Sequence, residues 1–134
     1  MIHVSWFNAE HSAILWRFDA RFSTEDAYLA LYCTRVLIRK TNTPFDIVAD
    51  MRKTMTIPSR VIELLRTAHA IAPETYHSTI FVEPSPFIKA LLGVAHTSRN
   101  MRGRFVFVAT LDQAARLVAA RRVDDPLEAA TQPV

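Results

Sequence analysis

Apolar positions along the chain follow two different spacings. Short apolar or alternating runs predict five strands, at residues 3–7, 13–18, 45–49, 78–82 and 105–108. Longer stretches carry apolar residues at intervals of three and four and predict helices, at about residues 24–40, 58–72, 86–95 and 111–122. The predicted order is β-β-α-β-α-β-α-β-α.

This order predicts an α/β fold with a mixed, mostly parallel five-stranded sheet and four helices. The first two strands are expected to form a hairpin, and the last three to lie centrally because they are apolar and follow helical crossovers. We expect one domain over residues 1–122 and a flexible tail over 123–134, where Pro126 and Pro133 stand among small and acidic residues.

The predicted helices have recognisable starts and apolar stripes. Ser23 with Asp26 is close to a capping box, and Ser85 and Thr110 are expected to cap the third and fourth helices. The inward-facing residues are expected to be Leu29, Ala30, Cys33, Val36 and Leu37 in the first helix, Val61, Leu64, Leu65, Ala68 and Ile71 in the second, and Phe87, Ile88, Leu91, Leu92 and Ala95 in the third.

Composition narrows the function classes. The 134 residues include one cysteine, Cys33, so no intramolecular disulfide forms, and no apolar run approaches the ~20 residues of a membrane helix. Without a signal-like start, we expect a cytoplasmic protein that does not bind membranes. The net charge of +3 is spread along the chain, which makes nucleic acid an unlikely partner. Two glycines exclude Gly-rich phosphate loops, so no cofactor is expected.

Candidate catalytic and metal-binding residues all have simpler interpretations. The five histidines show no i, i+4 pair, so no metal is expected, and Cys33 lies on an expected apolar stripe. The best enzymatic indication is the pair Asp46 and Asp50, on one side of the third strand, with Asp50 where α/β sheets bind ligands. We favour a loop-ordering Asp50, bonded to backbone amides or to Arg52, and expect no enzyme.

The element order and one local feature resemble a known family. A strand ends at Asp50, a loop of about eight residues follows, and a helix begins near Ser59. This is similar to the STAS domain of bacterial anti-sigma-factor antagonists, and to the related lipid-binding Sec14-like fold group, over residues 1–122. The family carries an Asp-Ser-Ser/Thr-Gly motif whose first Ser or Thr is phosphorylated. Aligning Asp50 places Ser59 on that residue, but Pro58 replaces the Asp and Val61 replaces the Gly.

The resemblance implies a non-catalytic regulatory module that docks a protein partner through residues 51–60 and the start of the second helix. Candidate phosphorylation or docking residues are Asp50, Arg52, Lys53, Thr56, Ser59 and Arg60. A phosphate on Ser59 would lie at a helix start among basic residues. The simpler interpretation is that Ser59 and Thr56 only cap the helix.

Three further expectations accompany this one. The chain can form a homodimer through the hairpin, and Phe7 with Phe18, or Trp6 with Trp16, can form an exposed aromatic patch. As an alternative function, the chain carries a small apolar or anionic ligand in a cavity between sheet and helices. In that case the anion-binding residues at its mouth are Arg99, Arg102 or Arg104.

Overall fold

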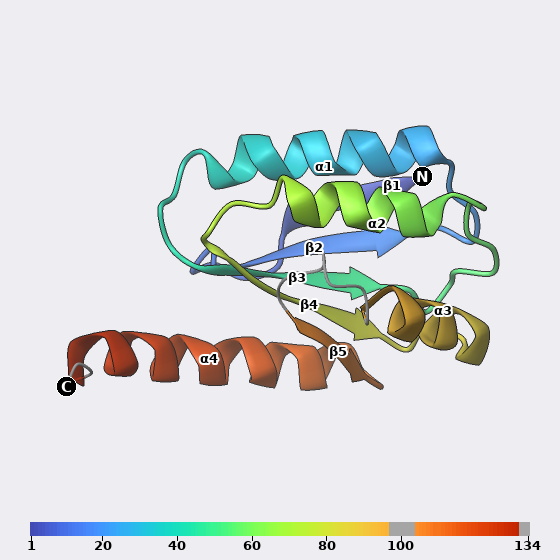
Figure 1. Ribbon diagram of the computed structural model, residues 1–134. Coiled ribbons are helices and arrows are strands. Elements are labelled where there is room, and N and C mark those ends of the chain that lie inside the picture. Colours follow the sequence, from blue (N-terminus) through green and yellow to red (C-terminus); the bar gives the residue numbers. More distant parts are fainter. Residues whose placement is uncertain (97–103, 132–134) are drawn as a thin grey trace.

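The computed structural model describes residues 1–96 and 104–131, with side chains described for residues 1–60, 63–91 and 105–121. The elements follow the predicted order (Figure 1). They are β1 (Ile2–Trp6), β2 (Ala13–Phe18), α1 (Thr24–Ile38), β3 (Phe45–Asp50), α2 (Val61–Ala70), β4 (Tyr76–Val82), α3 (Pro86–His96), β5 (Arg104–Val108) and α4 (Leu111–Thr131).

The strands form one sheet in the order β1-β2-β3-β4-β5. β1 pairs with β2 in antiparallel orientation, and all other pairs are parallel, which confirms the mixed, mostly parallel sheet. The expected central position is confirmed for β3 and β4 but wrong for β5. Each new strand is added beside the previous one, so the last strand closes the sheet at an edge.

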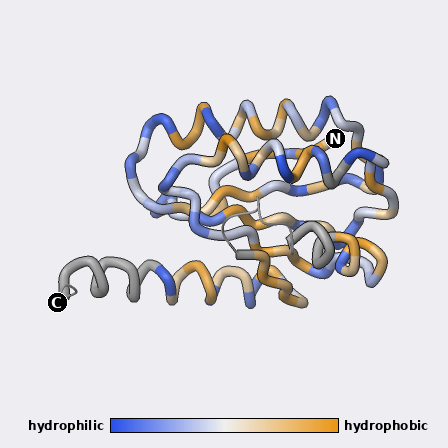
Figure 2. Tube along the Cα trace, in the orientation of Figure 1, coloured by the Kyte–Doolittle hydropathy of each residue, from blue (hydrophilic) through white to orange (hydrophobic). Residues whose placement is uncertain are grey.

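Helices cover both faces of the sheet and create two apolar cores (Figures 1 and 2). On the face of α1, α2 and α3, the buried apolar residues are Ile2, Phe18, Ala27, Ala30, Ala49, Met51, Leu64, Phe81 and Ile88. On the face of α4, they are Ala13, Val48, Ile80, Val82, Ala114 and Val118. Strands β2, β3 and β4 contribute to both cores, which explains their nearly continuous apolar sequence.

The predicted helix caps are confirmed. Ser23 Oγ accepts from the amide of Asp26 at 3.0 Å, and an Asp26 carboxylate oxygen accepts from the amide of Ser23 at 2.9 Å, which completes a capping box. Ser85 Oγ accepts from the amide of Ile88, and Thr110 Oγ1 accepts from the amide of Gln113. Local hydrogen-bonding residues therefore set the starts of α1, α3 and α4.

Of the inward-facing residues predicted for α1, only Ala30 is fully buried, so the buried face of the helix differs in part from the prediction. Ala27, Ala30 and Thr34 are buried, whereas Leu29 is 58% exposed and Cys33 is only partly buried. The fully buried side chains of α1 are thus small, and the indole Nε1 of Trp16 donates to Thr34 Oγ1 at 2.9 Å. The helix is therefore rotated relative to the predicted stripe.

Several helix boundaries also differ from the predictions. α2 begins at Val61 instead of near Pro58, and Ile71 lies just beyond its end and is 56% exposed. α4 continues to Thr131, through the segment for which the sequence predicts a tail. The domain limit at residue 122 stays a prediction.

The aromatic residues of the hairpin do not form the expected exposed patch. Phe18 is buried, and Phe7 packs against the core on the α4 face. Trp6 stacks on His11 with ring centroids 4.2 Å apart, and Trp16 is bonded to α1. In each expected pair, the two rings therefore pack against different parts of the fold.

Candidate functional site

The carboxyl end of the sheet is organised around Asp50, the last residue of β3. Asp50 is buried, and Arg52 donates to both of its carboxylate oxygens, from Nε at 2.8 Å and from a terminal guanidinium nitrogen at 2.8 Å. The main-chain amide of Arg52 adds a third hydrogen bond at 3.2 Å. This is the geometry of a loop-ordering carboxylate with a bidentate arginine partner.

The pair is ionised at neutral pH. Burial raises the pKa of Asp50, but the hydrogen bonds and positive charge of Arg52 outweigh burial, so that the net pKa lies below its ordinary value. The same contacts raise the pKa of Arg52. Asp50 is therefore already engaged as an anion, which leaves it poorly suited to general acid–base catalysis.

The loop over residues 51–60 is attached to the fold at further points. Met51 and Thr54 are buried, and the amides of Met55 and Thr56 both donate to the carbonyl of Ala20, at 2.8 and 3.3 Å. Between these anchors the side chain of Met55 is 78% exposed. A well-anchored loop thus holds a large apolar side chain in solvent.

The proposed capping role of Ser59 and Thr56 is wrong. The N-cap of α2 is Arg60, without a side-chain cap bond, and both Ser59 and Thr56 are exposed. Arg60 forms an exposed ion pair with Glu63 at 3.2 Å, and Lys53 is exposed. The structure thus joins Asp50 directly to Arg52 and distributes the other candidates along the loop surface.

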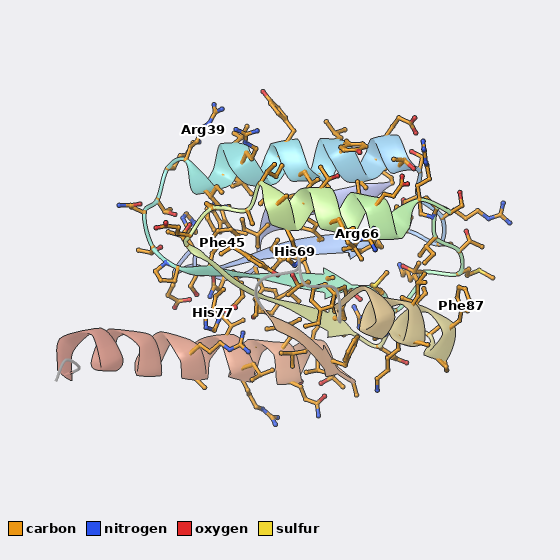
Figure 3. All side chains as sticks on the ribbon, viewed as in Figure 1. Arg39, Phe45, Arg66, His69, His77 and Phe87 are labelled. Carbon is orange, nitrogen blue, oxygen red and sulfur yellow. The ribbon has the colours of Figure 1, made fainter. Side chains whose placement is uncertain are left out.

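Phe87, at the start of α3, also lies at this end of the sheet. The sequence predicts that Phe87 faces inward, but it is 71% exposed, and Figure 3 shows it at the outer end of α3. Pro86 begins the helix and Ile88 takes the buried position, which turns Phe87 outward. The 51–60 loop follows β3 and α3 follows β4. Since these strands are parallel, Met55 and Phe87 both lie at the carboxyl end of the sheet.

A second polar cluster lies at the amino ends of β3 and β4, on the α4 face. Asp46 Oδ1 accepts from Ser78 Oγ at 2.5 Å and from Arg121 at 2.9 Å, and it lies 3.1 Å from His77 Nδ1. Arg121 also contacts Ser78 Oγ. Asp46 and Ser78 are buried. The cluster attaches α4 to the sheet, so Asp46 and Asp50 have separate partners and do not form a carboxylate pair.

Between α1, α2 and strands β2–β4 lies a cavity of about 130 Å³. Most of its lining residues are apolar: Trp16, Phe18, Leu31, Ile38, Phe45, Ile47, Ala49, Leu64, Leu65, Ala68, Ile71, Ala72, Pro73 and Phe81. The remaining ones are Thr34, Arg35, His69, Tyr76 and Thr79. His69 and Phe45 lie between the helices and the sheet (Figure 3).

Polar groups of the cavity are bonded to one another. His69 Nδ1 lies 2.9 Å from the carbonyl of Leu65, and the Tyr76 hydroxyl lies 3.4 Å from His69 Nε2 and 2.6 Å from Thr79 Oγ1. Burial raises the pKa of Tyr76 to about 12, an effect that Thr79 partly offsets and the charge of Asp46 increases. The Tyr76 phenol therefore stays protonated at neutral pH. Sequence reasoning missed this group because its members come from different elements.

The remaining predicted site residues lie partly outside the described structure. Arg99 and Arg102 are not among the described residues, and Arg104 begins β5 with its side chain undescribed. Within the described parts of the chain, no three His, Cys, Asp or Glu side chains gather to hold a metal ion. No helix in those parts is both long and apolar enough to cross a membrane.

Compared with models of known protein families and with curated protein sequences, the chain matches none.

Proposed function

We propose that the chain is a non-catalytic regulatory module that binds another protein at the carboxyl end of its sheet. The docking surface consists of Arg52, Lys53, Met55, Arg60 and Phe87. The observation that carries the proposal is the exposure of Met55 and Phe87, at 78% and 71% the highest among the large apolar side chains of the described residues. Both residues lie at the carboxyl end of the sheet.

The physical character of this surface suits protein recognition. Exposed methionine and phenylalanine are typical interface anchors, and the exposed cations around them favour a partner with an apolar groove and acidic neighbours. The Asp50–Arg52 pair and the bonds to Ala20 hold the loop before binding. Such preorganisation lowers the entropy lost on association.

The sequence resemblance favours one specific role for this module. We propose that it acts like a STAS domain and controls an anti-sigma factor. The element order and the position of the loop support it. Ser59 is exposed and does not cap α2, so it is accessible to a kinase. A phosphate there would add negative charge to a basic surface and weaken docking of an acidic partner. Cytoplasmic location, bacterial origin and a hairpin homodimer stay predictions from the sequence.

Photo-crosslinking in the native cell tests the docking surface. A photoreactive residue at position 55 should capture one major protein, and Phe87→Ser should reduce the capture at least tenfold. The matched control carries the same probe at position 29 on α1, where Leu29 is 58% exposed. Equal capture at positions 55 and 29, or none at position 55, would contradict the proposal.

A further inference from the structure

The cavity between α1, α2 and the sheet opens at the end opposite the docking surface. Its exposed lining residues are Arg35, Ile71 and Pro73, which lie at or just beyond the C-terminal ends of α1 and α2. Its buried lining residues include Ala49 and Phe81. The mouth is therefore near the amino ends of the parallel strands, and a ligand there would not compete with a partner on the docking surface.

The size of the cavity limits the part of a ligand that lies inside it to one ring. An engineered apolar cavity of roughly 150 Å³ binds benzene, whereas drug-sized ligands occupy about 300–1,000 Å³. At about 130 Å³ this cavity holds a benzene-sized group and not a lipid chain. The rings of Trp16, Phe45, Tyr76 and Phe81 line it, and their edges and faces offer favourable contacts to an aromatic ligand.

Polar side chains inside the cavity already form hydrogen bonds with one another. The Trp16 indole is bonded to Thr34, and the Tyr76 hydroxyl is bonded to Thr79. A polar ligand group placed there would have to replace these bonds. The part of the ligand inside the cavity should therefore be apolar.

The mouth, in contrast, carries positive charge. Arg35 is exposed, and the nineteen lining residues include no Asp or Glu. None of the ion pairs among the described residues involves Arg35. A guanidinium matches the two oxygens of a carboxylate in planar, bidentate geometry.

We propose that this cavity is a binding site for a monocyclic aromatic carboxylate, with the ring inside and the carboxylate on Arg35. The site is independent of the proposed docking surface. It narrows the small-ligand alternative considered from the sequence, because the ligand is much smaller than a lipid and its anion is bound at α1.

NMR titration with three probes tests the site. Benzoate should shift the methyl signals of Ala49 and Ala68, toluene should shift the same signals with weaker affinity, and acetate should leave them unchanged. Arg35→Gln should weaken benzoate about tenfold, which corresponds to the loss of about 1.4 kcal/mol from a charge-assisted contact, and should change toluene affinity less than twofold.

A cavity-filling variant provides the matched control. Ala68→Leu should abolish binding of both benzoate and toluene, whereas Ala70→Leu, on the exposed side of the same helix, should leave both unchanged. If Ala68→Leu does not fold, competition between toluene and benzoate for the wild-type protein tests the shared site. Failure of both ring probes to bind, or benzoate binding that Arg35→Gln leaves unchanged, would overturn the proposal.

Discussion

Replacing Arg52 by methionine should destabilise the protein in a pH-dependent way. The change removes both side-chain hydrogen bonds to Asp50, and leaves that buried carboxylate with the main-chain amide of residue 52 and the positive charge of Arg17. The aliphatic part of the side chain is largely kept. The variant therefore tests the charged contact on which the proposed shape of the 51–60 loop depends.

The expected loss in the free energy of unfolding is about 2 kcal/mol at neutral pH. Hydrogen bonds to charged groups contribute roughly 1.5–3 kcal/mol each, and leaving a buried carboxylate without its partner costs more. The Arg52 side chain is 46% exposed, however, so solvent screening reduces the sum. For a chain of 134 residues, such a loss lowers the melting temperature by about 7 °C.

The direction of the pH dependence follows from Asp50. Its folded-state pKa lies below the ordinary value of 3.8, so its contribution to stability is fully present above that value. The contribution is lost as the pH falls through the folded-state pKa, because a protonated Asp50 no longer attracts Arg52. The difference between wild type and Arg52→Met should therefore be full near neutral pH and should shrink as the pH falls below the ordinary value, through the lowered folded-state pKa of Asp50.

Urea unfolding followed by circular dichroism at several pH values measures this difference. Lys53→Met is the matched control, since Lys53 is an exposed cation on the same loop, and it should change stability by less than about 0.5 kcal/mol. A difference below about 0.5 kcal/mol for Arg52→Met, or one that is constant with pH, would contradict a stabilising Asp50–Arg52 ion pair.

Three further predictions concern other polar contacts. Arg121→Met should cost about 3 kcal/mol in urea unfolding, against less than about 0.5 for exposed Arg116→Met, because it leaves Asp46 buried without its cation. In an ultraviolet titration one of the three tyrosines should ionise near pH 12, and Tyr76→Phe should remove that step. The raised pKa means that Tyr76 contributes to folding stability below about pH 10, and that this contribution is lost as the pH rises toward 12. Ser23→Ala should lower stability by about 1 kcal/mol, and an unchanged midpoint would contradict the capping role.

Local signals in the sequence were sufficient to predict the element order and three helix caps. Ser23, Ser85 and Thr110 act on amides three residues away, so their role is written in adjacent positions. The face of α1 was harder, because that helix is apolar nearly all round. Its orientation depends on Trp16, eighteen residues from Thr34, and on the small volumes of Ala27 and Ala30.

The candidate sites were predicted only in part for a similar reason. Asp50 and Arg52 are two residues apart, and their contact was anticipated. The contact between Asp46 and Arg121 joins residues 75 apart, and no local pattern indicates it. Phe87 follows the expected helical spacing but faces solvent, because the orientation of a short terminal turn depends on tertiary packing.

The sequence suggested a cavity between sheet and helices only as an alternative, and its size could not be predicted because hydrophobic patterning does not register volume. The hydrophobic pattern requires apolar residues at positions 49, 68 and 72 but does not specify their size. The small side chains of Ala49, Ala68 and Ala72 line the cavity of about 130 Å³. Because the cavity opens to solvent at Arg35, Ile71 and Pro73, it costs less than the about 3 kcal/mol that an enclosed void of that size would cost at roughly 24 cal/mol per Å³. Ala68→Leu should recover about 1–2 kcal/mol of this in urea unfolding, whereas Ala70→Leu should recover none. If benzoate binds in this cavity, the stabilised Ala68→Leu variant should no longer bind it. A variant that gains stability and still binds benzoate would show that the cavity and the binding site are different.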